Sequence, residues 1–323
     1  MKRAGPSEPP GGADDGDTTC AAGRRIFGES ADPADYVARE ASDRALARLG
    51  SALRAGAPCG LLWGPPGLGK TLLLRVLEQR ARPVARPVHL AYASLSIEDL
   101  GAWVLGLAGE PRAADPVAGL VALARAEAAR GRALLLMIDE ANSMPIDTAR
   151  ALGALVAASD GALRLALAST DDARASRVVA ALGIEVAAHR FDEPMSESET
   201  CHYVTERLRR ADAGPAAWRV LDATRIRGLH ALSGGNPRRL HVLATELLRG
   251  EAGRHVLARL EPDWAGLLLA RASSDPPSEE DLEVGGDDTG AAPATHREHP
   301  PGDASGTSER PRRRSRLRRR QRR

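Results

Sequence analysis

One segment near residue 60 constrains the fold more than any other part of the sequence. The five residues from Cys59 to Trp63 form an apolar run that predicts a buried strand, and the next eight read Gly-Pro-Pro-Gly-Leu-Gly-Lys-Thr. This octapeptide matches G-x-x-x-x-G-K-[ST], and a helical pattern follows it over 69–82. A glycine-rich loop between a strand and a helix presents backbone N–H groups to an anion. The segment therefore predicts a phosphate-binding loop.

The loop predicts a nucleotide site with Mg²⁺. Its two prolines have no N–H, so the phosphate cradle must come from the amides of about 67–71. The chain has 45 Lys and Arg, of which only Lys2 and Lys70 are lysines, and the compact ammonium of Lys70 suits a place between two phosphates better than a guanidinium does. The hydroxyl of Thr71 is a predicted Mg²⁺ ligand. The predicted nucleotide-binding residues are Gly64, Pro65, Pro66, Gly67, Leu68, Gly69, Lys70 and Thr71.

A second motif ends in two acids. The apolar run 134–138 predicts a strand buried on both faces, and Asp139 and Glu140 follow it. Beside a phosphate loop, Asp139 is predicted to hold Mg²⁺ through water, and Glu140 to act as general base toward the attacking water. The alternative is that the two acids only cap the following helix.

The remaining pattern predicts an α/β domain followed by helices. Alternating strands and helices favour a parallel sheet with helices on both faces. The expected strands are 59–63, 88–94, 133–139, 163–169 and 184–191, and the expected helices between them are 36–55, 69–82, 97–108, 116–130, 146–158 and 173–182. After Pro194 the pattern becomes helical, at 197–211, 215–232, 237–249 and 252–271. The predicted organisation is a disordered leader 1–24, an α/β domain 25–195, a helical lid 196–272 and a disordered tail 273–323.

Together these motifs resemble those of AAA+ ATPases, which are P-loop NTPases. The loop resembles Walker A, and Leu-Leu-Leu-Met-Ile-Asp-Glu resembles Walker B. The resemblance implies that Ser169 and Thr170, which the pattern does not separate, stand at the sensor 1 position and that Arg238 is the sensor 2 arginine. Within the class, the segment Gly-Gly-Asn-Pro-Arg and the junction 193–208 are similar to those of the bacterial ExeA/GspA-type and TniB/MuB-type ATPases.

The resemblance also implies oligomers with active sites between subunits. Glu185 stands where an arginine finger would be expected, and three arginines lie nearby. We take Arg177 as the candidate finger, with Arg174 and Arg190 as alternatives and a solvated helix face as the simpler interpretation.

Charge is unevenly distributed along the chain. The last 14 residues, from Arg310 to Arg323, hold ten arginines and no acid, whereas the rest has 35 Lys and Arg against 43 Asp and Glu, a net charge of −8. The arginine-rich end predicts a salt-dependent DNA contact that is blind to sequence. It could instead pair with the nine acids of 275–303, or reflect only the arginine-rich composition.

Two functional classes fit these observations. In the first, the chain hydrolyses ATP to drive a conformational change on DNA or a DNA-bound complex. In the second, it is a slow nucleotide switch that binds a protein partner without DNA. Three scattered cysteines form neither a disulfide framework nor a zinc site, and no run of 18 apolar residues exists. We therefore expect a cytoplasmic protein without a membrane span.

Overall fold

The computed structural model describes residues 23–28 and 30–250, and all of these lie in one compact unit. Most of the predicted leader, the predicted helix 252–271 and the arginine-rich tail lie outside the described residues.

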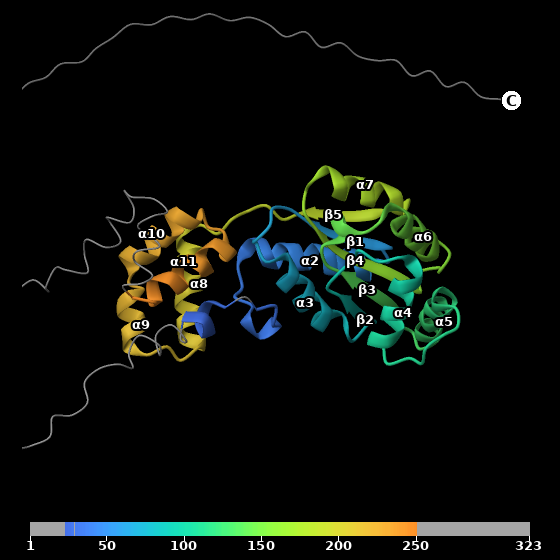
Figure 1. The fold of residues 1–323 in the computed structure, drawn as a ribbon, viewed down its shortest axis with the longest axis horizontal. Coiled ribbons are helices and arrows are strands. Elements are labelled where there is room, and N and C mark those ends of the chain that lie inside the picture. Colours follow the sequence, from blue (N-terminus) through green and yellow to red (C-terminus); the bar gives the residue numbers. More distant parts are fainter. Residues whose placement is uncertain (1–22, 29, 251–323) are drawn as a thin grey trace, which may run out of the picture. The chain divides into compact units, whose positions relative to one another are not determined.

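A five-stranded parallel sheet forms the centre of the first part of the chain (Figure 1). Its order is β2-β3-β4-β1-β5. The strands are β1 (Cys59–Trp63), β2 (Ala85–Leu90), β3 (Ala133–Ile138), β4 (Leu163–Ser169) and β5 (Val186–Arg190). Every pair is parallel, and the register aligns Trp63 with Ser169, so the ends of β1 and β4 are level. This common edge is where the phosphate loop begins.

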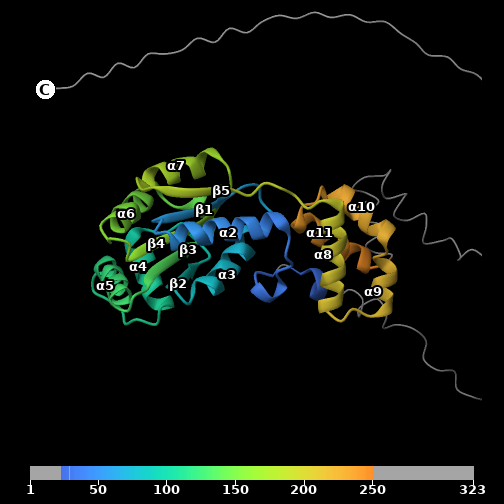
Figure 2. The ribbon, with the colours of Figure 1, turned by 180° about the vertical axis from the view of Figure 1, so that it is seen from behind.

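Helices cover both faces of the sheet, as the sequence predicts (Figures 1 and 2). One face packs against α2 (Glu40–Arg54) and α3 (Lys70–Ala81). The other packs against α4 (Ile97–Leu107), α5 (Pro116–Ala129), α6 (Ile146–Ala157) and α7 (Ala173–Leu182). Consecutive β3 residues alternate between these layers, with Leu136 in one and Met137 in the other. A strand covered on both faces needs a continuous apolar run, and β3 has one.

The chain after β5 is helical throughout its described residues. The helices are α8 (Glu197–Arg210), α9 (Pro215–Val220), α10 (Ala223–Ser233) and α11 (Pro237–Leu248), and we call them the lid helices. Their core also holds Ile26 and Phe27 from the beginning of the described chain, which are 1% and 2% exposed. Arg207 fixes this segment, because its Nε donates to the carbonyl oxygen of Ile26 at 2.8 Å. The sequence pattern did not predict that these early residues pack with the lid.

Several predicted bounds differ from the structure by a few residues, and the differences at one strand and one helix have a clear physical reason. The strand expected at 88–94 is β2, which begins three residues earlier and includes Pro87. Proline is tolerated there because β2 is an edge strand, where one N–H need not bond. The helix expected at 215–232 is two helices, because Asp222 caps a new one by accepting the N–H of Arg225 at 2.8 Å.

Candidate nucleotide-binding site

The phosphate loop spans the gap between β1 and α3, as the sequence predicts. Gly69 stands immediately before α3 with φ 99°, a left-handed conformation that glycine adopts without strain. The first turn of α3 therefore points its free N–H groups back into the loop. A cavity of about 340 Å³ opens beside it and is lined by Pro66, Gly67 and the start of α3.

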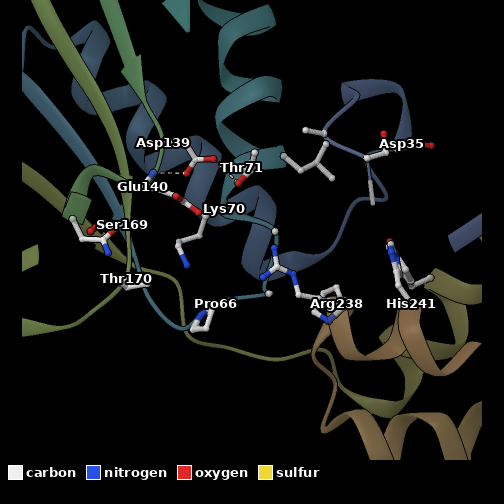
Figure 3. Close-up of a pocket in the computed structure, with 18 of the residues that line it drawn as sticks. Asp35, Pro66, Lys70, Thr71, Asp139, Glu140, Ser169, Thr170, Arg238 and His241 are labelled. Carbon is white, nitrogen blue, oxygen red and sulfur yellow. Dashed lines mark hydrogen bonds between the residues drawn. The ribbon is translucent and has the colours of Figure 1, made fainter. Parts of the chain in front are cut away.

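The cavity collects most of the predicted site residues from distant parts of the chain (Figure 3). Its predicted members are Pro66, Gly67, Gly69, Lys70, Thr71, Asp139, Glu140, Ser169, Thr170 and Arg238. The predicted loop residues Gly64, Pro65 and Leu68 do not line it. Leu68 is 6% exposed and packs into the core under α2 and α3.

The Lys70 ammonium is held by the loop itself. Its Nζ donates to the carbonyl oxygens of Gly64 and Pro65, each at 2.8 Å. Burial lowers the pKa of Lys70, and the charge of Arg238 lowers it further, whereas Asp139 and Asp171 raise it. The ammonium is therefore already desolvated and directed toward the region that the loop encloses.

The side-chain oxygens of Thr71 and Asp139 lie in direct contact. The Thr71 hydroxyl donates to Oδ2 of Asp139 at 2.5 Å, although 68 residues separate them. Asp139 is 7% exposed, and its Oδ1 accepts the N–H of Glu140 at 2.9 Å. Mg²⁺ prefers oxygen ligands and takes one or two from protein beside substrate phosphates and water. The pair fits that ion, whereas no group of three or more His, Cys, Asp or Glu able to hold a metal occurs within 23–28 and 30–250.

Glu140 has an unusual backbone. Its φ and ψ are 46° and 42°, in the left-handed region that residues other than glycine rarely occupy. In a regular strand, consecutive side chains face opposite ways. The turn at Glu140 breaks that alternation, so both Asp139 and Glu140 line the same cavity. The structure thereby explains how two adjacent acids can serve one site.

The two candidates at the end of β4 have different surroundings. Ser169 is 2% exposed, and its Oγ hydrogen-bonds no group of the described chain. The Thr170 hydroxyl donates to Asp172, whose other carboxylate oxygen caps α7. Ser169 therefore has a hydroxyl available for a ligand in the cavity, and Thr170 has a local structural partner.

The lid contributes the opposite wall. Arg238 lies in the first turn of α11, one residue after its beginning at Pro237, and its backbone N–H donates to the carbonyl oxygen of Gly67 at 3.2 Å. Figure 3 shows Arg238 between Lys70 and the lid end of the cavity. That end is lined by residues that the sequence analysis did not select: Ser30, Ala31, Asp35, Leu72, Asn142, Tyr203, Arg207, Pro237 and His241.

An aromatic pair and an ion pair form this lid end. Tyr203 and His241 stack, and the Tyr203 hydroxyl lies 2.7 Å from Nε2 of His241. Burial, and secondarily Arg207, lowers the pKa of His241 to about 4, so the imidazole is neutral at pH 7. Arg207 is 6% exposed and pairs with Asp35 at 2.9 Å. Because these residues come from three separate segments, no local motif could have identified them.

Other arginines that the sequence offers for partners are mostly engaged within the chain. Arg174 donates to the carbonyl oxygen of Ser143, and Arg190 pairs with Asp171 and Asp192. Arg177 is exposed on α7. Among the lid arginines, Arg209, Arg210 and Arg225 each pair with a nearby acid.

Solved structures that resemble this fold include those of two proteins. One is the ORC2 protein of Aeropyrum pernix in ADPNP-ADP complexes, 18% identical, which aligns over 77% of this chain and 72% of that chain with a TM-score of 0.50. The other is Cdc6p from Pyrobaculum aerophilum, 19% identical, over 73% of this chain and 66% of that chain with a TM-score of 0.52. No curated protein matches the chain.

The strand–loop–helix geometry and the parallel sheet define a P-loop nucleotide-binding fold. Residues 53–176 match the family model described as an AAA domain. This part of the chain, from the end of α2 through β4 into α7, therefore carries a P-loop domain of the AAA type, as the resemblance implies. The narrower resemblance to the ExeA/GspA and TniB/MuB types stays a prediction. Within the described part of the chain, no helix combines the length and apolarity that crossing a membrane requires.

Proposed function

We propose that the chain binds ATP with Mg²⁺ in this cavity, hydrolyses it, and uses the presence of the γ-phosphate to set the position of the lid. One observation carries the proposal. Lys70 and Thr71 of the loop, Asp139 and Glu140 after β3, Ser169 of β4 and Arg238 of the lid line a single cavity. Each has the chemistry that one part of phosphoryl transfer to water needs.

The loop and the first acid bind the phosphates. Lys70 exchanges its two carbonyl partners for the β- and γ-phosphate oxygens, which are stronger acceptors because they are charged. Thr71 and, through water, Asp139 hold Mg²⁺, which neutralises charge on the phosphates when it is bound. Their 2.5 Å contact supports this role, because it places both oxygens at one point of the cavity.

The second acid and the β4 serine act on the water. Glu140 accepts a proton from the water that attacks the γ-phosphate, and Ser169 orients that water or the phosphate. Arg238 contacts the γ-phosphate from the lid. Loss of the phosphate then removes a charged partner from α11, and the lid moves in response.

The nucleoside occupies the lid end of the cavity. The neutral His241 and its stacked partner Tyr203 offer flat, uncharged surface to a base. The acids that handle the γ-phosphate lie at the other end (Figure 3). A nucleotide whose phosphates lie along the loop would therefore point its base toward this pair.

A Glu140→Gln variant tests the hydrolytic role. We expect Mg²⁺-dependent phosphate release to fall by about 10²–10⁴-fold, the usual contribution of a general base. Binding of a fluorescent ATP analogue should persist, because Lys70 and the loop are intact. Glu98→Gln is the matched control, since this exposed glutamate on α4 lies outside the cavity. Unchanged phosphate release in Glu140→Gln would contradict the assignment.

We also propose that the active unit is an oligomer in which Arg177 reaches the neighbouring site. Its exposure supports this choice, and so does the engagement of Arg174 and Arg190 with groups of their own chain. Arg177→Ala should then lower turnover per subunit and remove the rise of specific activity with protein concentration. A concentration-independent wild-type rate would contradict it.

DNA is the first candidate target and a protein partner the second. The ten arginines between Arg310 and Arg323, outside the described residues, support DNA through counterion release. The ion pairs of Arg209, Arg210 and Arg225 with nearby acids make these three lid arginines weaker candidates for that contact than the tail. ATPase rates with and without DNA over a salt series, for the intact chain and a chain lacking 310–323, test this. Stimulation that is lost in the truncated chain supports DNA, whereas no effect at low salt and a partner captured only with ATP supports the slow switch.

The predicted division into a leader 1–24, an α/β domain 25–195, a lid 196–272 and a tail 273–323 is retained as a proposal. So is the cytoplasmic setting, which the free thiols of Cys59 and Cys201 support.

A further inference from the structure

The turn between α10 and α11 touches the phosphate loop directly. The side-chain amide of Asn236 makes hydrogen bonds to the loop on one side and to the start of α11 on the other. Its Nδ2 donates to the carbonyl oxygen of Pro66 at 3.0 Å, across 170 residues. Its Oδ1 caps α11 by accepting the N–H groups of Arg238 at 3.1 Å and Arg239 at 3.3 Å. One side chain thus fixes both the start of a lid helix and the middle of the loop.

A second hydrogen bond lies beside the first. The N–H of Arg238 also donates to the carbonyl oxygen of Gly67 at 3.2 Å. The lid therefore binds two successive loop carbonyls, and it does so at close range. A Cβ added to Gly67 would lie 2.6 Å from Oδ1 of Asn236 and 3.0 Å from Cβ of Arg238. Only a glycine lets the lid approach the loop this closely.

The other side of the turn is anchored to the connection between β5 and α8. The N–H of Met195 donates to the carbonyl oxygen of Gly235 at 2.9 Å. A Cβ at Gly235 would lie 2.1 Å from the carbonyl oxygen of Met195. The turn is therefore packed tightly between the loop and the connection that leads into the lid helices.

Peptide planarity connects these contacts to phosphate binding. The carbonyl of Pro66 shares a rigid plane with the N–H of Gly67, and the carbonyl of Gly67 shares one with the N–H of Leu68. These N–H groups belong to the predicted cradle, and their carbonyls bond the lid. Any rotation that brings the N–H groups onto a phosphate must move the carbonyls to which α11 is attached.

We propose that Asn236 is a positioning residue that couples occupancy of the phosphate loop to the lid and holds Arg238 over the γ-phosphate. This inference rests on the proposed ATPase function. It adds a second route by which the lid responds to a bound phosphate, through the loop backbone, so that the response does not depend on the Arg238 side chain alone. Asn236 contacts no reacting atom, and it acts through the loop carbonyl and through the position of α11.

Asn236→Ser separates coupling from helix capping. Serine caps a helix about as well as asparagine, so α11 keeps its first turn. Serine has no amide donor and is too short to reach the carbonyl oxygen of Pro66. We expect kcat to fall about tenfold, the equivalent of one hydrogen bond used in positioning, while KM for ATP changes by less than about threefold. Asp222→Ser is the matched control, because Asp222 caps α10 and does not line the cavity.

Hydrogen exchange provides a readout that does not depend on turnover. Without nucleotide, the amide of Arg238 should exchange about tenfold faster in Asn236→Ser than in the wild type, because its loop acceptor, the carbonyl of Gly67, is no longer held in place by the bond from Asn236 to Pro66. In the wild type, ATP should change the exchange of 67–71 and of 238–240 together. If Asn236→Ser does not fold, this wild-type comparison still tests the coupling.

Two results would overturn the proposal. One is an Asn236→Ser variant with wild-type kcat, KM and exchange, which would make Asn236 a helix cap only. The other is an ATP effect on the loop amides that leaves the lid amides unchanged. A wild-type chain that neither binds nor hydrolyses ATP would instead refute the proposed function, and the nucleotide-free exchange would still report on the contact.

Discussion

The left-handed backbone at Glu140 predicts that the site is built at a cost in stability. For an L-residue this conformation is about 1–2 kcal/mol above the right-handed one. Glycine adopts it freely, although glycine also gains about 0.4–1 kcal/mol of unfolded-state entropy. The two effects together predict that Glu140→Gly raises the free energy of unfolding by about 0.5–1 kcal/mol. The same change should abolish turnover, because it removes the proposed base.

Two comparison variants isolate the backbone effect. Glu140→Gln keeps a side chain at φ 46°, so it should lose turnover without gaining stability. Asp160→Gly changes another left-handed residue, at φ 50°, that lies outside the cavity. Aspartate tolerates this region better than glutamate does, so its replacement should have almost no net effect on stability and none on turnover.

Urea unfolding of the four proteins measures the difference. A higher urea concentration at the midpoint of unfolding, with an unchanged slope of the free energy of unfolding against urea concentration, would place the effect in the native state. In thermal unfolding the gain corresponds to about 1–4 °C for a domain of this size. Equal stability of Glu140→Gly and Glu140→Gln, or a loss in the glycine variant, would refute the idea that the backbone at this position is strained.

Two further predictions concern a buried carboxylate and the candidate sensor. Glu127 is fully buried and accepts hydrogen bonds from three arginines, including Arg86 at 3.0 Å. Glu127→Ala should therefore lower the free energy of unfolding, measured by urea titration, by about 3 kcal/mol. Burial raises the pKa of the Glu127 carboxylate, but the hydrogen bonds from the arginines outweigh burial, so the pKa is lowered in the folded state. The stability that Glu127 contributes should therefore be present above its unfolded-state pKa and be lost as the pH falls through its folded-state pKa. A stability difference between the wild type and Glu127→Ala that does not depend on pH would contradict this. Ser169→Ala should reduce turnover more than Thr170→Ala, because the Thr170 hydroxyl serves Asp172; the reverse order in phosphate-release assays would assign the sensor to Thr170.

The α/β part could be predicted closely from its sequence. The apolar run of β3 and the glycine-rich loop before α3 each carry a local signal, because a doubly covered strand and a phosphate loop need particular residues in succession. The errors had two causes. Tertiary context decided at Pro87, which lies inside a strand only because that strand is at the sheet edge. At Asp222 the helical pattern was extended past a local signal, because the Asp222 side chain caps a new helix through the N–H of Arg225.

The candidate site likewise has a part that the sequence predicts and a part that only the folded structure reveals. The sequence by itself identified the residues that we propose for the phosphate chemistry, since Lys70, Thr71, Asp139 and Glu140 belong to motifs of adjacent residues. Only the tertiary structure decided that Thr71 meets Asp139, that the stacked pair of Tyr203 and His241 lies at the lid end, and that Asn236 holds the loop. These contacts join residues 38 to 170 positions apart. Local spacing encodes helices, strands and turns, but contacts of this range depend on how the finished layers pack.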